Sequence, residues 1–569
     1  MNTLTDILEK SAAQNTSKTA LQIKEAGSYF RLSYSQLFDF SRKMAAALKN
    51  LGIHPGDTVG IMAENSPYWG VAFFSILSAR AVVVPMDTKS MEHSILQIIH
   101  HSKCKAVFVS QKYRDIFHRI LKISMSKPVL IVLDRPGHGR GDFSLQDFVN
   151  QSYLKIDHEK PLLDDLAVIL YTSGTTGSPK GVMLTHANIS SNVEAISSGV
   201  PFSKNDQFVS ILPLCHTYAI TADFLIPIEA GATVTYVENL KGSVLVERMQ
   251  ENQATVLIAV PALIQMMYNQ MMLKIEALPP ARKKLFHVMK AISGFFLKLG
   301  LPIGHILFKS LKDKLSPSLR FFISGGAPID PRIIEEYFKM GIPIYQGYGL
   351  TETSPILTVN TPKANRIGSV GKPIPEVEIR IENQEIVARG PNVMRGYYKN
   401  EEATLEVLKQ GWFYTGDIGY FDKDRYLYIS GRLKNIIVTR GGKNVSPEEV
   451  EEELCRSAWV KEACVVGVMK ETRGFKGDEQ VYALIVPNIE AFKAVGVGPE
   501  DKKRIEGQIY QEVKGANERL ADYKRIRGFE IWDELPKTTT LKIKRKDALK
   551  MLKDRGYQPI NKTQFFRVS

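Results

Sequence analysis

The chain has 569 residues, 44% of them hydrophobic, and is therefore long enough to bury more than one hydrophobic core. Its formal net charge of +14 and its isoelectric point near 9.2 favour an anionic partner: nucleic acid, an anionic membrane surface or an anionic small molecule. The sequence contains no zinc-ligand spacing, aromatic RNA-binding strand or basic heptad region, which argues against nucleic acid.

The cysteines and the N-terminal segment both favour a cytoplasmic protein. The cysteines are widely scattered without a CxxC pair, which is typical of reduced thiols. Residues 1–14 include acids and lack a basic start followed by a long apolar stretch, so no signal peptide is predicted. The most apolar window, 68–85, is interrupted by Arg80 and predicts a buried helix leading into a strand. The four cysteines are Cys104, Cys215, Cys455 and Cys464.

The first 160 residues alternate between helical and strand-like patterns. Such alternation predicts a parallel sheet with helices on its faces, and no site is visible in this part. The helical spacing covers 34–51, and the strand-like runs are 58–62, 81–84, 106–110 and 128–133.

Two apolar runs, 166–171 and 182–186, enclose a loop of glycine and hydroxyl residues that ends in Lys180. The runs predict two strands at a sheet edge. Glycines permit positive φ and close approach to a ligand, hydroxyls donate hydrogen bonds, and a lysine adds positive charge, so the loop suits a polyphosphate. The flanking Pro179 and Gly181 exclude a Walker loop; a flexible linker is the alternative. The residues expected at the phosphates are Thr172, Ser173, Gly174, Thr175, Thr176, Gly177 and Lys180.

Two further strands, 208–212 and 256–260, are followed by residues that could contact a substrate. His216 lies just after the first strand, where open α/β sheets place ligands, although a packed histidine is the alternative. From Pro261 to Ser316, a helical region combines apolar residues with many lysines. Two interpretations stay open for it: a helix in the interface of an anionic membrane, or an amphipathic insert packed on the protein body.

Two small-residue turns are predicted after the strands 319–323 and 342–344, where a flat base can lie against the backbone. Tyr348 offers a stacking face, Thr351 a hydroxyl for a phosphate and Glu352 a carboxylate for Mg²⁺. The nucleotide-contacting residues expected here are Gly325, Gly326, Ala327, Pro328, Tyr345, Gln346, Gly347, Tyr348, Gly349, Leu350 and Thr351.

The last third contains three polar features after predicted strands or turns. Asp417 follows a glycine and offers two acceptor oxygens to the hydroxyls of a ribose, with a turn-stabilising role as the alternative. Ser446 begins a helix with Pro447 at its first position and Glu449 completing a capping box. Near the end, Lys542 lies in a lysine-rich tail, where a surface charge is the alternative. Strands are predicted at 426–430, 465–468 and 481–486.

The loop 171–181, the turn 345–355, Asp417, the Gly431–Arg432 pair and the tail 535–545 together resemble, in this order, the signatures of the acyl-adenylate-forming superfamily. The resemblance implies an α/β fold with a large N-terminal body of parallel and mixed sheets flanked by helices, and a small mobile C-terminal α+β domain. The implied domains are 1–432, which binds ATP and the acyl substrate, and 433–569, which carries the catalytic lysine.

The resemblance also implies roles for individual residues. Lys542 is expected to be the catalytic lysine, with Thr351, Glu352 and His216 as further catalytic residues, and Glu352 as the Mg²⁺ ligand. The segment 390–398 resembles a family element and is expected to be structural. One departure is Leu541, where the family has glycine. The remaining implied roles are ATP binding at Asp417 and Arg432, the hinge at Lys434, CoA binding at Arg440, Gly441, Gly442 and Lys443, and an acyl pocket at His216, Tyr218 and Val260.

The resemblance implies an AMP-forming ligase that joins an acid to coenzyme A (CoA). The insertion at 261–316 resembles one in the longer-chain fatty acyl-CoA synthetases, which favours a medium- or long-chain fatty acid. Tyr218 stands where amino-acid-activating members have an aspartate, which argues against an amino-acid substrate. Two alternatives stay open: a ligase that hands the acyl group to a carrier protein, and a non-catalytic nucleotide-binding protein of the same fold.

Overall fold

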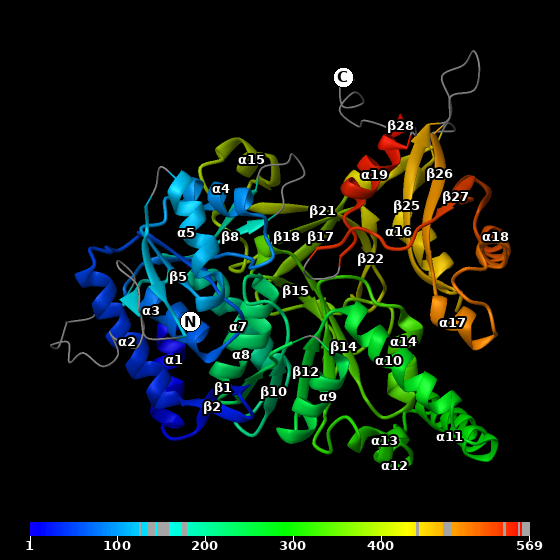
Figure 1. Ribbon diagram of the computed structural model, residues 1–569, viewed down its shortest axis with the longest axis horizontal. Helices are drawn as coiled ribbons and strands as arrows, with labels where there is room; N and C mark the ends of the chain where they lie inside the picture. The colour runs from blue at the N-terminus through cyan, green and yellow to red at the C-terminus, as the bar shows by residue number, and fades with distance from the viewer. Residues whose placement is uncertain are drawn as a thin grey trace. The chain divides into compact units, whose positions relative to one another are not determined.

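The structure is a computed structural model of the chain. It describes residues 1–124, 127–134, 143–144, 159–172, 179–239, 241–439, 443–469, 479–538, 542–555 and 558–559. The chain forms two compact units, which are described separately (Figure 1). The first unit contains Met1–Arg380, Val387–Tyr414 and Lys423–Leu427, and the second contains Ile381–Ile386, Thr415–Asp422 and Tyr428–Ser569. The chain therefore passes between the units several times, and the domain boundary after residue 432 stays a prediction.

One sheet of the first unit has eight strands in the order β19-β9-β8-β4-β3-β5-β6-β7. The neighbours from β8 to β7 are parallel, whereas the β9–β8 and β19–β9 pairs are antiparallel. The strands are β3 (Thr58–Met62), β4 (Val82–Pro85), β5 (Ala106–Val109), β6 (Val129–Val132), β7 (Phe143–Ser144), β8 (Leu166–Thr172), β9 (Lys180–Thr185) and β19 (Gly396–Tyr397).

A second sheet of this unit has nine strands in the order β16-β15-β14-β13-β12-β10-β11-β1-β2. Its centre, from β14 to β1, is parallel, so the carboxyl ends of these strands share one edge. The strands are β1 (Thr19–Glu25), β2 (Ser28–Ser33), β10 (Gln207–Ser210), β11 (Thr233–Tyr236), β12 (Val256–Ala259), β13 (Phe321–Ser324), β14 (Ile344–Gly349), β15 (Ile356–Val359) and β16 (Lys372–Pro373).

Helices cover both sheets, and their starts follow local capping chemistry. The Ser33 side chain and the Gln36 side chain form a reciprocal capping box at the start of α2. Ser66 caps α3, whose side chains are almost all buried, as predicted for the window 68–85. The helices in this part are α1 (Leu4–Gln14), α2 (Tyr34–Asn50), α3 (Pro67–Ser78), α4 (Glu92–Ser102), α5 (Arg114–Ile123), α7 (His186–Gly199), α8 (Ile226–Glu229) and α9 (Gly242–Glu251).

The predicted helical region 261–316 is a series of helices rather than one. The helix α11 packs on α14 through Ser293, whose hydroxyl donates to the Lys339 carbonyl oxygen at 2.6 Å, and through the neighbouring Gly294. In Figure 1, α11 extends beyond α10 and α14 at the lower right of the first unit. The helices are α10 (Pro261–Glu276), α11 (Pro280–Lys298), α12 (Gly304–Leu307), α13 (Lys309–Asp313) and α14 (Pro331–Lys339), and α15 (Glu401–Val407) follows later in the chain.

The second unit is built on a four-stranded sheet of order β27-β26-β25-β28. The helices α16 and α18 pack on one face around Val450 and Ile509, and α19 packs on the other with Trp532 and Leu552. The elements are η4 (Leu433–Asn435), β23 (Ile437–Val438), β24 (Asn444–Val445), α16 (Pro447–Cys455), β25 (Val460–Met469), β26 (Glu479–Pro487), α17 (Ile489–Ala494), α18 (Lys502–Arg519), β27 (Gly528–Ile531), α19 (Arg545–Asp554) and β28 (Gln558–Pro559).

A five-stranded sheet contains the points where the chain passes from one unit to the other. Its path runs β17-β18-β21-β20, and β22 pairs with β21. Within the second unit, the Thr415 hydroxyl donates to the Ile386 carbonyl oxygen at 2.7 Å. The strands are β17 (Glu378–Glu382), β18 (Glu385–Arg389), β20 (Leu408–Lys409), β21 (Trp412–Phe421) and β22 (Leu427–Arg432).

The α/β class and the predicted strands are confirmed, but two local predictions are wrong. Ser446 precedes α16, yet its hydroxyl donates to the Ser430 carbonyl oxygen at 2.6 Å and forms no capping box with Glu449. The Ser446 side chain is turned toward the Ser430 carbonyl oxygen, and its oxygen accepts no backbone N–H at the start of the helix. The segment 345–349, predicted as a turn, continues β14 as a strand because β15 pairs with it.

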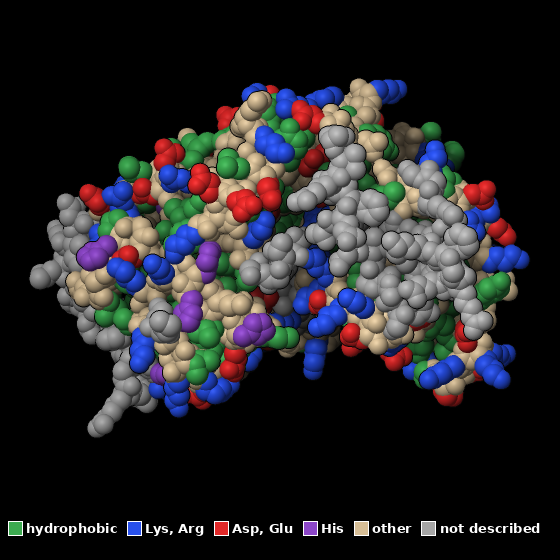
Figure 2. Space-filling model, turned by 90° about the horizontal axis from the view of Figure 1, so that it is seen from above, with side chains coloured by type: hydrophobic (Ala, Val, Ile, Leu, Met, Phe, Trp, Pro, Cys, Tyr) green, Lys and Arg blue, Asp and Glu red, His purple; other side chains and the backbone are tan. Residues whose placement is uncertain are grey.

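Within the described ranges, no helix combines the length and apolar character needed to cross a bilayer. On the face drawn in Figure 2, Lys and Arg side chains lie among Asp and Glu side chains.

Candidate active site

The predicted phosphate loop connects two paired strands. β8 and β9 are antiparallel, with Thr172 opposite Lys180 and Tyr171 opposite Gly181. Lys180 is therefore the first residue of β9, at the point where the chain leaves the loop. The neighbouring strand β19 lies at the edge of the sheet. The loop residues Ser173, Gly174, Thr175, Thr176 and Gly177 lie outside the described residues.

Tyr397 on β19 connects Lys180 with Glu352. The Lys180 Nζ lies 5.0 Å from the centre of the Tyr397 ring, within the range of a cation–π contact. The Tyr397 hydroxyl donates to Glu352 Oε1 at 2.8 Å. Burial and the Glu352 charge raise the pKa of Tyr397 above its ordinary value, so the hydroxyl keeps its proton and can donate. Tyr397 was not among the predicted site residues, and the pairing of β19 with β9 brings it here.

Glu352 lies on the short 3₁₀ helix η3 (Thr351–Thr353), which follows β14. The Thr353 hydroxyl accepts the Leu350 backbone N–H at 3.0 Å, and the Glu352 carbonyl oxygen accepts the Met394 N–H at 2.8 Å. Thr351 and Glu352 are both half-buried. A half-buried carboxylate with its backbone fixed and one oxygen hydrogen-bonded fits the oxygen ligation that Mg²⁺ prefers, so Glu352 is a chemically suitable ligand.

The strand β14 offers its backbone, rather than most of its side chains, to a ligand. Tyr345 is buried and packs on Phe321 with the ring centres 5.4 Å apart, and Gln346 is buried as well. A methyl group on Gly349 would lie 1.7 Å from the Pro355 carbonyl oxygen. Glycine is needed there because the returning chain comes that close, which is a different reason from the predicted approach of a base. Gly347, Tyr348 and Leu350 are half-buried.

The carboxyl ends of β12 and β13 bring the predicted acyl-pocket and nucleotide residues together. Val260 follows β12 directly, and the Gly325 N–H donates to the carbonyl oxygen of Ala259 at 3.3 Å. A methyl group on Gly325 would lie 2.8 Å from the Tyr218 ring, so the tyrosine packs against this turn. Gly326 has a φ of +83°, a left-handed conformation that favours glycine. Ala327 and Pro328 complete the turn before α14.

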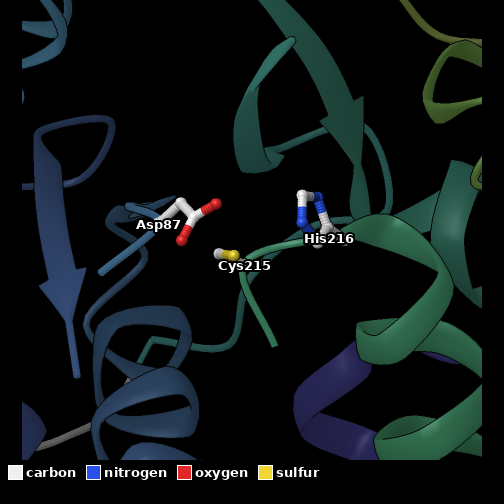
Figure 3. A group of neighbouring side chains, drawn as sticks. All are labelled: Asp87, Cys215 and His216. Atoms are coloured by element: carbon white, nitrogen blue, oxygen red, sulfur yellow. The ribbon is translucent and has the colours of Figure 1, made fainter. Parts of the chain in front are cut away.

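His216 lies beside Cys215 and Asp87 in a cluster that the sequence did not suggest (Figure 3). One ligand atom from each of the three side chains lies within 4.8 Å of the others. Burial and the Asp87 charge raise the pKa of the Cys215 thiol above its ordinary value, so the thiol carries its proton. Asp87 is far from Cys215 and His216 in the sequence, and the three residues belong to no common motif. Only the folded chain therefore reveals the cluster.

A buried acid, Asp223, lies near Tyr218. The sequence did not indicate it as a candidate site residue. It belongs to the π-helix η2 (Ala219–Leu225), a rare form that often occurs at functional sites. Asp223 is completely buried, and burial raises its pKa to about 7. The Ser210 hydroxyl and the backbone at 211–212 lower that pKa in part, but neither carboxylate oxygen has a well-formed hydrogen bond within the described residues. Asp223 is therefore a titratable group beside the predicted acyl pocket.

In the second unit, Asp417 and Arg432, both predicted to bind ATP, form an ion pair. Arg432 Nε lies 2.8 Å from Asp417 Oδ1, with the aspartate buried and the arginine 44% exposed. Lys434 is exposed on η4, directly after β22, and Lys443 is exposed before β24. The other predicted CoA residues, Arg440, Gly441 and Gly442, lie outside the described residues.

Lys542 in the second unit is paired with Thr538 through its backbone. Its N–H donates to the Thr538 hydroxyl at 3.1 Å, and its carbonyl oxygen accepts the Thr538 N–H at 2.8 Å. The lysine is exposed, whereas Leu541, the departure from the family pattern, lies outside the described residues. Three residues later, Arg545 anchors the start of α19 by hydrogen bonds to Glu451.

Comparison with known proteins identifies the family. The AMP-binding enzyme family matches residues 8–398, and its C-terminal domain matches residues 449–542. The chain belongs to the AMP-binding enzyme family. The family match covers Lys180, Glu352 and Tyr397 in its first part and ends at Lys542 in its second.

Two relatives of this AMP-binding enzyme are fatty-acid ligases with different acceptors. It is 30% identical to the long-chain-fatty-acid–CoA ligase FadD15 of Mycobacterium bovis, over 89% of this chain and 88% of the relative. It is 29% identical to AEE15 of Arabidopsis thaliana, a chloroplastic long-chain-fatty-acid–[acyl-carrier-protein] ligase, over 90% of this chain and 79% of the relative. The ATP-bound crystal structure of MatB from Rhodopseudomonas palustris superposes with a TM-score of 0.77 at 26% identity, covering 98% and 100% of the two chains.

These comparisons confirm the predicted acyl-adenylate-forming superfamily and its α/β fold. The AMP-binding enzyme described here is therefore a ligase of the class that activates acids with ATP.

Proposed function

We propose that the protein activates a medium- or long-chain fatty acid as acyl-AMP and transfers the acyl group to CoA. The observation that supports it most is the link through Tyr397, whose ring contacts Lys180 and whose hydroxyl donates to Glu352. Binding the negative charge of a triphosphate requires positive groups, here a lysine and a carboxylate that is suited to hold Mg²⁺. The fatty acid and the CoA acceptor are supported by the name of the FadD15 relative.

The proposed chemistry has two steps. In the first, a carboxylate oxygen attacks the α-phosphorus of ATP, the bond between that phosphorus and the bridging oxygen breaks, and pyrophosphate leaves. In the second, the CoA sulfur attacks the acyl carbon, the bond to the AMP oxygen breaks, and the thiol proton is released to solvent. The first step concentrates negative charge, so positive groups fixed in position lower its barrier.

Each site residue has a part in this proposal. Lys180 and the loop 173–178 bind the β- and γ-phosphates, and Glu352 would hold Mg²⁺, which would supply further charge compensation there. Lys542 offsets charge between the carboxylate and the α-phosphate. The turn 325–328 and the backbone of β14 receive the adenine, with Tyr348 as its stacking face. Thr351 donates to a phosphate, and Asp417 with Arg432 receives the ribose.

The acyl chain and the acceptor are assigned to two further groups of residues. His216, Tyr218 and Val260 form the wall of the acyl pocket, and the aromatic Tyr218 suits an apolar chain rather than an ammonium group. Lys443 and the preceding residues 440–442 contact CoA. Lys434 acts as the pivot between a domain of residues 1–432 and a domain of residues 433–569, so that the second step can proceed without Lys542.

The decisive experiment measures pyrophosphate release with fatty acids of increasing chain length, with and without CoA. We expect release with medium or long chains and thioester formation when CoA is present. Release without thioester, followed by acyl transfer to an acyl carrier protein, would replace CoA with the acceptor named for the AEE15 relative. Absence of release with every acid would identify a non-catalytic nucleotide-binding protein.

The division of labour is tested by Lys542→Ala. This variant should lose acid-dependent pyrophosphate release but retain thioester formation from supplied acyl-AMP, because only the first step needs the charge. Lys546→Ala is the matched control, since this exposed lysine lies four residues further along the same segment. Equal loss of both half-reactions in a folded Lys542→Ala protein would contradict the assignment.

The helix α11 carries a surface that suits an anionic bilayer. Its apolar side chains recur every three or four residues along the side opposite the buried Ser293 and Gly294. Phe295 and Leu299 are each 61% exposed. The stripe consists of Leu285, Val288, Ile292, Phe295 and Leu299, all of them exposed.

Basic residues flank this stripe on both sides. Helical spacing places Arg282 at one edge and Lys284 and Lys298 at the other, all three exposed. None of the three forms an ion pair within the described part of the chain. Each basic residue near an anionic bilayer contributes about 1 kcal/mol of binding free energy, and burial of the apolar side chains adds to it. We therefore propose an anionic membrane as the partner of this surface.

Vesicle sedimentation tests the membrane contact. We expect binding to phosphatidylserine-containing vesicles at low salt and little binding to phosphatidylcholine alone. Phe295→Ser and Lys284→Glu should each weaken binding, whereas the exposed Leu405→Ser and Lys363→Glu, which lie outside the stripe, should not. Equal binding of all four variants, or no sedimentation of the parent protein, would remove the membrane from the proposal.

A further inference from the structure

The cluster of Asp87, Cys215 and His216 combines three kinds of metal ligand in one place (Figure 3). A thiol sulfur, an imidazole nitrogen and a carboxylate oxygen lie within 4.8 Å of one another. This mixed set differs from a group of acids, which bind hard cations weakly through oxygen alone. Sulfur and nitrogen ligands together select borderline transition metals, of which Zn²⁺ is the common tetrahedral one.

The backbone that carries Cys215 and His216 is held in place from outside the segment. Asn65, which follows β3, donates its side-chain amide to the Leu212 carbonyl oxygen at 2.6 Å and accepts the Leu214 N–H at 3.0 Å. The His216 N–H closes a turn on the Pro213 carbonyl oxygen at 3.1 Å, and the His216 carbonyl oxygen accepts the Ile220 N–H at 3.0 Å. The two side chains therefore project from a fixed turn.

Asp87 is fixed in a similar way on the other side of the cluster. It lies two residues after β4, and its Oδ1 accepts the backbone N–H of Lys89 at 2.9 Å. Its carbonyl oxygen accepts the Ser90 N–H at 3.0 Å, which closes a turn. The carboxylate is thereby oriented, and Figure 3 shows it projecting toward the cysteine and histidine.

We propose that Asp87, Cys215 and His216 form a Zn²⁺ site with an open fourth position. In a tetrahedral zinc site with bonds of about 2.0–2.3 Å, the ligand atoms lie about 3–4 Å apart. The three ligand atoms lie within 4.8 Å of one another, so the side chains would move closer together when the metal binds. Three protein ligands leave the fourth position to water or to a ligand from solution.

The site also predicts an effect on the proposed enzyme, and this consequence rests on the proposed function. His216 is part of the proposed acyl-pocket wall, so a metal that holds its ring restricts the position of that wall. Occupancy by Zn²⁺ should therefore inhibit adenylation, and the inhibition should be relieved by a chelator. The site would couple the activity of the enzyme to the availability of zinc.

Metal binding is tested directly on the full chain, independently of activity. After chelator treatment, Zn²⁺ titration against a colorimetric indicator should show one equivalent bound, and Co²⁺ should give a thiolate-to-cobalt charge-transfer band. Cys215→Ser should abolish that band and weaken Zn²⁺ binding by at least about tenfold, and Asp87→Asn should weaken it as well. The control Cys455→Ser, at an exposed cysteine elsewhere in the chain, should bind as the parent does.

A second measurement keeps the test valid if a variant folds poorly. In the parent protein, one equivalent of Zn²⁺ should slow the alkylation of Cys215 but leave that of Cys455 unchanged, as read by peptide mass. Zn²⁺ should also inhibit pyrophosphate release in the parent and not in Cys215→Ser. Binding without a stoichiometric site, or unchanged Cys215 alkylation with Zn²⁺, would overturn the proposal. Zinc binding with no adenylation activity would instead refute only the proposed function.

Discussion

The hydroxyl of Tyr397 should tune the use of Mg²⁺ by the proposed enzyme. Tyr397→Phe removes the hydrogen bond of 2.8 Å to Glu352 and keeps the ring over which Lys180 lies. A hydrogen bond to a charged group is worth about 1.5–3 kcal/mol when buried, and the half-buried Glu352 recovers part of this from water. A net loss of about 1 kcal/mol corresponds to about a fivefold change in affinity.

The assay is the Mg²⁺ dependence of pyrophosphate release at saturating acid. Tyr397→Phe should raise the half-saturating Mg²⁺ concentration about fivefold, because the carboxylate loses its fixed orientation, and should leave the KM for the acid unchanged. Tyr397→Leu also removes the cation–π contact, worth about 0.5–1 kcal/mol, and should weaken ATP binding further. Tyr398→Phe is the control, since that ring packs against His101 rather than Glu352.

Tyr397→Phe with an unchanged melting temperature and the same Mg²⁺ dependence as the parent and Tyr398→Phe would refute this role of the hydroxyl. That result would mean that the hydrogen bond does not orient Glu352 in the working enzyme. A change confined to the KM for the acid would equally contradict the assignment, because it would place Tyr397 in the acyl pocket.

Three other predictions concern stability and nucleotide binding. Burial raises the Asp223 pKa to about 7 from an ordinary value of 3.8, so the folded state holds a proton that the unfolded state has lost, and stability should fall as pH rises from about 4 to about 7. Asp223→Asn should remove this slope and raise the melting temperature at pH 8, and an unchanged pH profile in thermal melts would contradict it. Gly349→Ala places a methyl group 1.7 Å from the Pro355 oxygen and should cost more than about 2 kcal/mol in denaturant unfolding, whereas Gly507→Ala, in open space within α18, should stabilise by about 0.5–1 kcal/mol. Arg432→Ala leaves the buried Asp417 without its ion pair and should weaken ATP binding measured by calorimetry, while Asp417→Asn in the same protein should recover stability but not affinity.

The sequence by itself determined the fold class and the order of the site segments. Apolar runs of four to seven residues predicted strands such as β8, β9 and β12, because a strand buried on both faces needs a continuous apolar run. Lys180, Glu352 and Lys542 could be named because a glycine-rich loop, a turn after a strand and a lysine-rich tail are local patterns. Their proposed roles depended on the resemblance of the whole series of segments.

Only the tertiary structure decided which residues are neighbours. Tyr397 is separated by 45 residues from Glu352 and reaches it through the pairing of β19 with β9. Asp87 meets Cys215 because the ends of strands from two different sheets come together, and no local pattern records that meeting. Ser446 shows the converse: its local capping pattern was complete, but its side chain is turned toward the Ser430 carbonyl oxygen and accepts no N–H of the helix. Local patterns report backbone preference, whereas side-chain partners depend on contacts between distant segments, which a linear sequence does not display.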